Sequence, residues 1–130
     1  MKLLTDTNAL LWASCAPGRL TDKARQAVYD AEEISFSIVN IWEIALKLSK
    51  GGFSDLDVPY DWDRKLVPRL LEKGYRMIPV MIDHCRRIQD LPLHHKDPFD
   101  RMLIAQALET GLTVIGSDAQ FDAYGVRRIW

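Results

Sequence analysis

Residues 2–12 read KLLTDTNALLW and contain the pattern that decides the fold. The stretch opens with a short apolar run at 2–5, and it closes with an apolar segment at helical spacing. A polar triplet that begins with Asp6 separates the two. A strand followed at once by a helix indicates one unit of an α/β sheet, with a carboxylate at the point where the strand ends.

The composition is that of an ordinary globular protein. Of the 130 residues, 48% are hydrophobic and 27% are charged, which is enough to bury a core, so we expect one domain over residues 1–130. The net charge of −1 argues against a global basic field for nucleic acid. No apolar run reaches the roughly 20 residues of a membrane helix, and the N-terminus lacks the apolar core of a signal peptide. We therefore expect a cytoplasmic protein with free thiols at Cys15 and Cys85.

Short β-like runs alternate with helical patterns along the chain. The expected strands lie at 2–5, 34–37, 77–80, 113–116 and 128–130, and the expected helices at 8–15, 21–31, 39–50, 61–72, 82–89 and 98–110. This alternation predicts an α/β fold of three layers, α/β/α, with a central, mainly parallel sheet of four to five strands. Ligands of such sheets bind outside the carboxyl ends of the strands.

Acidic residues gather where this rule places a ligand site. Asp6 directly follows the first strand, and Asp118 follows the fourth. Glu43 lies about one turn into the helix after the second strand. Because the carboxyl ends of parallel strands meet at one edge of a sheet, we expect these side chains to lie close together.

A further acid is expected from the segment HKDPFDRMLIAQAL at 95–108. Pro98 suits the first position of a helix, and Asp97 before it suits the N-cap. Asp100 shares a helix face with the apolar stripe that follows it, so its carboxylate is expected to point inward. The pattern therefore favours Asp97 as a cap and Asp100 as a site residue, although the DPFD motif offers both.

Each acid taken alone also has a purely structural interpretation. Asp6 and Asp118 could cap the helices that follow them, and Asp100 could complement the dipole of its helix. Helical periodicity places Glu43 opposite the apolar face of its helix, where a solvated pair with Lys47 would account for it. From the residues alone these alternatives stay open.

The acids taken together are more informative than any one of them. Two carboxylates about 4 Å apart repel by about 4 kcal/mol at an effective dielectric near 20, so a fold that gathers several needs a positive partner. The strand-end argument places no Lys or Arg among them. The sequence therefore predicts a hard divalent cation, Mg²⁺ or else Mn²⁺, which takes oxygen ligands and suits phosphodiester hydrolysis.

Three stretches of the chain also resemble one protein family. LLTDTNALLW at 3–12, SIVNIWEIALKLSKGG at 37–52 and LPLHHKDPFDRMLIAQALETGLTVIGSDAQFDAYGV at 91–126 are similar to the PIN-domain family, and most of all to its VapC-like toxins of type II toxin–antitoxin systems. The resemblance implies a Mg²⁺-dependent endoribonuclease of compact α/β/α fold. It also implies a homodimer whose activity is inhibited by a cognate antitoxin.

The resemblance assigns roles to individual residues. The acids of the family fall on four residues that would be both catalytic and metal-binding: Asp6, Glu43, Asp100 and Asp118. The auxiliary candidates are Asn8, Ser117, Asp97 and Asp122. Beside the DPFD acids, Lys96, Arg101 and His95 are expected to contact the phosphates of an RNA substrate.

Three alternative functions fit the pattern less well. A phosphatase of the haloacid dehalogenase type needs an acid two residues after its nucleophile, where this chain has Asn8. A phosphoacceptor receiver domain needs a Lys after its last long strand, where this chain has Asp118. A non-catalytic module of the same fold, binding RNA or a protein partner, is separable from a nuclease by a titration with Mg²⁺ or Mn²⁺.

Overall fold

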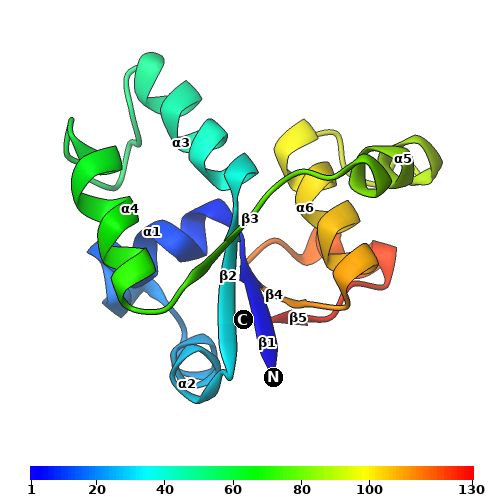
Figure 1. The fold of residues 1–130 in the computed structure, drawn as a ribbon, viewed down its shortest axis with the longest axis horizontal. Coiled ribbons are helices and arrows are strands. Elements are labelled where there is room, and N and C mark those ends of the chain that lie inside the picture. Colours follow the sequence, from blue (N-terminus) through cyan, green and yellow to red (C-terminus); the bar gives the residue numbers. More distant parts are fainter.

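The computed structural model describes residues 1–130 and contains one sheet of five parallel strands (Figure 1). The strands are β1 (Lys2–Thr5), β2 (Glu33–Ser37), β3 (Arg76–Ile78), β4 (Thr113–Ile115) and β5 (Arg128–Ile129). Their order in the sheet is β3-β2-β1-β4-β5, so β1 is the central strand. The predicted parallel sheet is confirmed, and every strand begins within one residue of its predicted start.

Helices connect the strands. They are α1 (Thr7–Cys15), η1 (Pro17–Arg19), α2 (Asp22–Asp30), α3 (Ile38–Ser49), α4 (Trp62–Glu72), α5 (Ile82–Asp90), α6 (Pro98–Thr110) and η2 (Ala119–Tyr124), where η marks a 3₁₀ helix. The six predicted helices are confirmed, each beginning within one residue of its predicted start. None of the helices combines the length and apolar character that crossing a bilayer requires.

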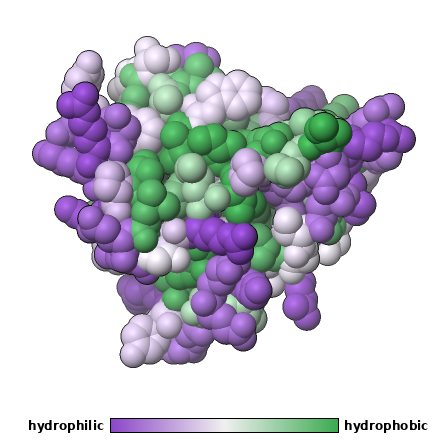
Figure 2. Space-filling view, in the orientation of Figure 1, coloured by the Kyte–Doolittle hydropathy of each residue, from purple (hydrophilic) through white to green (hydrophobic).

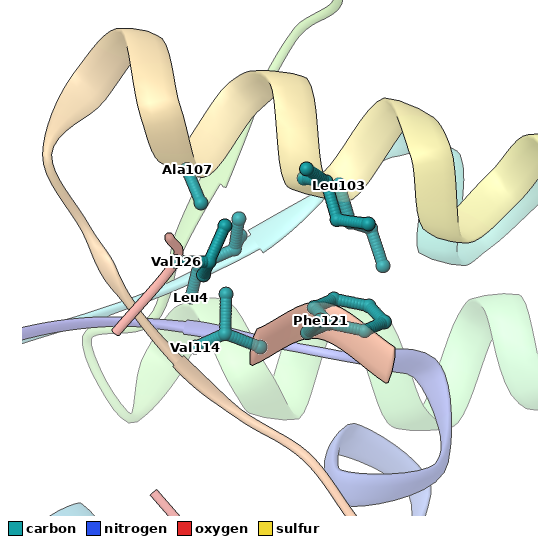
Figure 3. Packing of buried hydrophobic residues seen from close by; sticks show 7 residues of the cluster. Leu4, Leu103, Ala107, Val114, Phe121 and Val126 are labelled. Atoms are coloured by element: carbon teal, nitrogen blue, oxygen red, sulfur yellow. The ribbon is translucent and has the colours of Figure 1, made fainter. Parts of the chain in front are cut away.

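The sheet lies between two layers of helices. Figure 1 shows α1, α2, α3 and α4 on one side of the strands and α5 and α6 on the other. Alternate residues of β1 enter opposite cores, as the period of two in a strand demands. Leu3 packs with Ala9 of α1, whereas Leu4 packs beneath α6 with Leu103 and Val114 (Figure 3). The expected three-layer α/β/α arrangement is therefore confirmed.

Local signals fix both ends of α6. Asp97 is the N-cap, because its Oδ1 accepts a hydrogen bond of 3.0 Å from the Asp100 amide, and Pro98 takes the first helical position. Gly111 ends the helix at a φ of 72°, a left-handed conformation that glycine adopts without steric strain. The predicted cap and stop are confirmed, and the start of α6 places Asp100 near the ends of the central strands.

A candidate metal centre at the carboxyl edge of the sheet

A small polar pocket opens where β1 and β4 end and where α6 begins. Its volume is about 140 Å³, and no hydrophobic residue lines it. The lining residues are Asp6, Thr7, Asn8, Glu43, Lys47, Asp97, Asp100, Ser117 and Asp118. The structure thus brings together all four acids that the sequence singled out, along with the auxiliary candidates other than Asp122.

Asp6 combines a capping role with a place in the pocket. Its Oδ1 accepts a hydrogen bond of 2.7 Å from the Ala9 amide, which caps α1. Its own amide donates to the Ile115 carbonyl of β4 at 2.9 Å, so the residue is fixed against the neighbouring strand. Burial raises the pKa of the Asp6 carboxyl to about 7; the Ala9 hydrogen bond opposes the rise, and three nearby carboxylates add to it.

Glu43 points into the pocket, which corrects the expectation from helical periodicity. That pattern placed Glu43 on a solvated face of α3, yet the residue is only 6% exposed because this face packs against the start of α1. The Thr7 hydroxyl donates to Glu43 Oε1, and Asn40 Nδ2 donates to Thr7 Oγ1 at 3.0 Å. The expected pair with Lys47 is present, with Nζ 3.2 Å from Glu43 Oε2, but it lies at the pocket.

His95 lies between the other two acids of the site. Its Nε2 is 2.8 Å from Asp118 Oδ2 and 3.1 Å from Asp100 Oδ2, and the residue is buried. Burial raises the pKa of the Asp100 carboxyl, the carboxylates of Asp97 and Glu43 raise it further, and His95 opposes the rise. Asp118 also accepts a hydrogen bond from the Gln120 amide and so caps η2.

Basic groups are distributed differently from the expectation. The strand-end argument placed no Lys or Arg among the acids, whereas Lys47 belongs to the pocket lining. Of the three side chains assigned to RNA, His95 faces the acids, and Arg101 donates to the carbonyl oxygens of Pro92 and His95 at 3.0 and 3.3 Å. Lys96 is exposed, away from the acidic pocket, and lines a neighbouring apolar groove. Contact of these residues with RNA stays a prediction.

Asp122 lies outside the pocket. Arg128 donates from Nε and Nη2 to its two carboxylate oxygens, each at 2.9 Å, and this hydrogen bonding lowers the pKa of the Asp122 carboxyl. Arg128 also donates to the Gly116 carbonyl at 3.0 Å. Asp122 therefore contributes to the site only through Arg128, whose hydrogen bonds link η2 to the end of β4.

The pocket residues fit a hard divalent cation. Five carboxylates, with hydroxyl and amide groups beside them, supply the oxygen donors that Mg²⁺ and Mn²⁺ prefer. Oxygen atoms of Asp100 and Asp118 and a ring nitrogen of His95 lie within 4.8 Å of one another. Burial, and to a lesser extent neighbouring carboxylates, raises the pKa of Asp6 and Asp100, and a cation would stabilise the charged form of both.

Fold and pocket together define a class of protein, a parallel α/β domain with an acidic site at the carboxyl edge of its sheet that suits a divalent cation. Sequence comparison identifies the family within that class. The chain belongs to the PIN domain family, whose sequence model matches residues 3–126. The matched range contains all five acids that line the pocket, and the resemblance noted from the sequence is thereby confirmed.

Solved structures share this fold at low sequence identity. VapBC2 from Rickettsia felis, bound to a promoter DNA fragment, has a TM-score of 0.68 and 13% identity, covering 98% of this chain and 97% of that chain. FitAcB from Neisseria gonorrhoeae has a TM-score of 0.63 and 20% identity, covering 97% and 95%. A toxin–antitoxin complex from Klebsiella pneumoniae has a TM-score of 0.60 and 19% identity, covering 93% and 90%. No curated protein sequence is a significant match to this chain.

Gly116 leaves the room that Asp6 needs, and this generates a first prediction. A Cβ at position 116 would clash with Asp6 Oδ2, and Asp6 is held in place by the Ala9 amide. We expect Gly116→Ala to lower the free energy of unfolding by about 1–3 kcal/mol, as overpacking does elsewhere. Urea denaturation measures this. Gly18→Ala, whose added Cβ meets nothing within 4 Å, is the matched control; equal losses in the two variants would contradict the close approach.

Asp6→Asn separates the charge of Asp6 from its capping role, because Asn caps about as well as Asp. The pKa of the Asp6 carboxyl is about 7 in the folded protein and has the usual value of 3.8 in the unfolded chain. As the pH rises, Asp6 therefore ionises at a lower pH in the unfolded chain than in the folded protein. The metal-free wild type should therefore lose stability progressively between about pH 4 and pH 7. In EDTA above pH 7, we expect Asp6→Asn to be more stable than wild type by about 1–2 kcal/mol, with no difference below pH 4.

Thermal and urea unfolding across this pH range measure the effect of Asp6→Asn. Asp122→Asn is a control of opposite sign, because Arg128 stabilises the charged form of Asp122 and its neutralisation should not stabilise the protein. If Asp6→Asn instead destabilises the protein at every pH, Asp6 is a structural cap, and its negative charge does not destabilise the folded protein.

Proposed function

We propose that this chain is a Mg²⁺-dependent endoribonuclease and the toxin of a type II toxin–antitoxin system, acting in the cytoplasm, with Mn²⁺ able to replace Mg²⁺. The observation that carries the proposal is the convergence of Asp6, Glu43, Asp100 and Asp118 on one small polar pocket. Membership of the PIN domain family supports nuclease activity. The toxin–antitoxin complex that shares the fold supports the biological role.

The acids would have different roles in hydrolysis. Asp6, Asp100 and Asp118 would hold the cation, which supplies Lewis acidity toward the phosphate and lowers the pKa of a water molecule. Glu43 is oriented by the hydroxyl of Thr7, so its carboxylate faces the pocket and can accept a proton from the attacking water. Asp6 and Glu43 are buried, Asp100 and Asp118 are half-buried, and hydrogen bonds from neighbouring groups hold all four, which preorganises the site before substrate arrives.

Neighbouring side chains would hold the RNA backbone. Lys47 carries its positive charge at the pocket, 3.2 Å from Glu43 Oε2, where it can contact a phosphate oxygen. Asn8 and Ser117 are exposed at the pocket and offer an amide and a hydroxyl to the same phosphate. Lys96 is exposed beside the start of α6 and suits a flanking phosphate. None of these contacts reads a base, so we expect them to position the strand and not to select its sequence.

The activity is tested with purified protein and single-stranded RNA. Wild type should cut RNA with Mg²⁺ or Mn²⁺ and stop cutting with EDTA. Asp100→Asn should lower the cleavage rate by about 10²–10³-fold, the loss typical of removing a group that stabilises charge in the transition state. Asp97→Asn is a matched control three residues away, and its effect should be much smaller because Asn can still cap α6. Equal cutting in EDTA, or the reverse ranking of the two variants, would contradict the assignment.

An apolar groove beside the site supports a protein partner. Its volume is about 660 Å³, seven of its ten lining residues are hydrophobic, and α3, α5 and α6 contribute to it. Trp42 in its wall is 62% exposed and meets the Phe99 ring edge-on at 4.8 Å. Figure 2 shows hydrophobic surface over this face, and Ile38, which also lines the groove, is exposed. Contiguous apolar surface of this kind marks protein interaction sites, and we propose a cognate antitoxin as its occupant.

The toxin role is tested in growing bacteria. Induced wild type should arrest growth, Asp6→Asn should not, and co-expression of a small protein encoded beside this chain should restore growth. A harmless wild type that still cuts RNA in vitro would overturn the toxin role and leave the nuclease intact. The predicted homodimer is decided separately, by light scattering from the purified chain.

A further inference from the structure

We infer that His95 is a positioning residue. Its Nε2–H donates a hydrogen bond to Asp100 and Asp118 and fixes the positions of these two carboxylates, and His95 does not itself bind the metal. The inference rests on the proposed metal centre at the same pocket and adds to it which atoms ligate. It also replaces the expectation that His95 contacts RNA.

The Nδ1 side of the ring fixes the tautomer. The Asp97 amide lies 3.1 Å from His95 Nδ1 and donates to it. A backbone N–H can only donate, so Nδ1 must present a lone pair. In a neutral imidazole one nitrogen carries the proton when the other accepts, so the proton of His95 lies on Nε2.

The Nε2 side of the ring meets two acceptors. Asp118 Oδ2 lies at 2.8 Å and Asp100 Oδ2 at 3.1 Å. An Nε2–H between two carboxylates is attractive, whereas a bare lone pair there would repel both. Asp100 belongs to α6 and Asp118 follows β4, so the shared proton joins two separate elements of the fold.

The ring is also anchored through its backbone. The His95 amide donates to the Tyr124 hydroxyl at 2.7 Å, and the His95 carbonyl accepts from Arg101 Nη1 at 3.3 Å. The ring packs edge-on against the buried Phe121, with centroids 6.1 Å apart. These contacts fix His95 from several sides, as a residue that orients others requires.

Ligation of a metal by His95 would disturb this arrangement. A bond from Nε2 to a metal needs a lone pair on Nε2, so the proton would have to move to Nδ1. A proton on Nδ1 would point at the N–H of Asp97, whose nitrogen is 3.1 Å away, and two hydrogen-bond donors in this position repel each other. The hydrogen bond to the residue that caps α6 would be lost. The ligands are therefore oxygen atoms alone, which favours Mg²⁺ and Mn²⁺ over metals that prefer imidazole nitrogen.

Nitrogen NMR of the wild-type chain tests the tautomer directly. Spectra of ¹⁵N-labelled protein in EDTA and in saturating Mg²⁺ should show His95 with a proton on Nε2 and a lone pair on Nδ1 in both states. A proton on Nδ1 in EDTA would overturn the inference, and so would its appearance there when Mg²⁺ is added. This measurement needs neither RNA nor a variant that folds.

Calorimetric titration with Mg²⁺ tests the positioning role. His95→Ala should weaken Mg²⁺ binding by about 10–100-fold, the usual effect of removing a residue that orients metal ligands. His95→Gln should recover most of this loss, because its side-chain amide can donate from about the position of Nε2. His94→Gln is the matched control, since His94 is exposed and its ring lies against Tyr124.

The outcomes separate this inference from the proposed function. Equal loss in His95→Gln and His95→Ala would overturn the positioning role, and so would unchanged affinity in His95→Ala. If wild type binds Mg²⁺ and the Nε2 proton is lost, His95 is a ligand and only the inference fails. If wild type binds neither Mg²⁺ nor Mn²⁺, the proposed metal centre fails, and the inference fails with it.

Discussion

The repulsion among the five carboxylates gathered at one edge of the sheet is the constraint on which the rest of the structure depends. Two such charges about 4 Å apart repel by about 4 kcal/mol at an effective dielectric near 20. The raised pKa values of Asp6 and Asp100 reflect burial together with this repulsion. A fold that keeps the charges in place must supply a rigid backbone and nearby donors, and this chain supplies both.

The rigidity comes from the central strand and the donors come from residues close to each acid. β1 pairs with β2 and β4, and its adjacent leucines are buried in opposite cores, so the end of the strand that carries Asp6 is firmly held. The Ala9 amide donates to Asp6, and the Thr7 hydroxyl donates to Glu43. The Asp100 amide donates to Asp97, and the His95 ring donates to Asp100 and Asp118. Each acid therefore has a donor from the chain itself, while the summed negative charge still favours a cation.

The sequence predicted those parts of the site that depend on strand order and helix capping. Asp6 and Asp118 could be placed because parallel strands end at one edge, and Asp100 could be distinguished from its neighbouring cap by its helix face. Helical periodicity alone left the role of Glu43 open, and the family resemblance assigned it to the site. Periodicity assumes one buried face, whereas α3 is buried on a second face by α1. His95 was grouped with RNA-binding residues, since no local pattern shows which way an imidazole turns in an irregular segment.

A manganese-soaked crystal of the wild-type protein tests most directly whether these carboxylates form a cation site. Anomalous diffraction should show a strong peak in the pocket, at about 2.0–2.6 Å from oxygen atoms of Asp6, Asp100 and Asp118, as expected for hard divalent cations. His95 Nε2 should lie beyond bonding distance of that peak. A pocket without anomalous density, or a peak bonded to His95 in place of the carboxylates, would contradict the account.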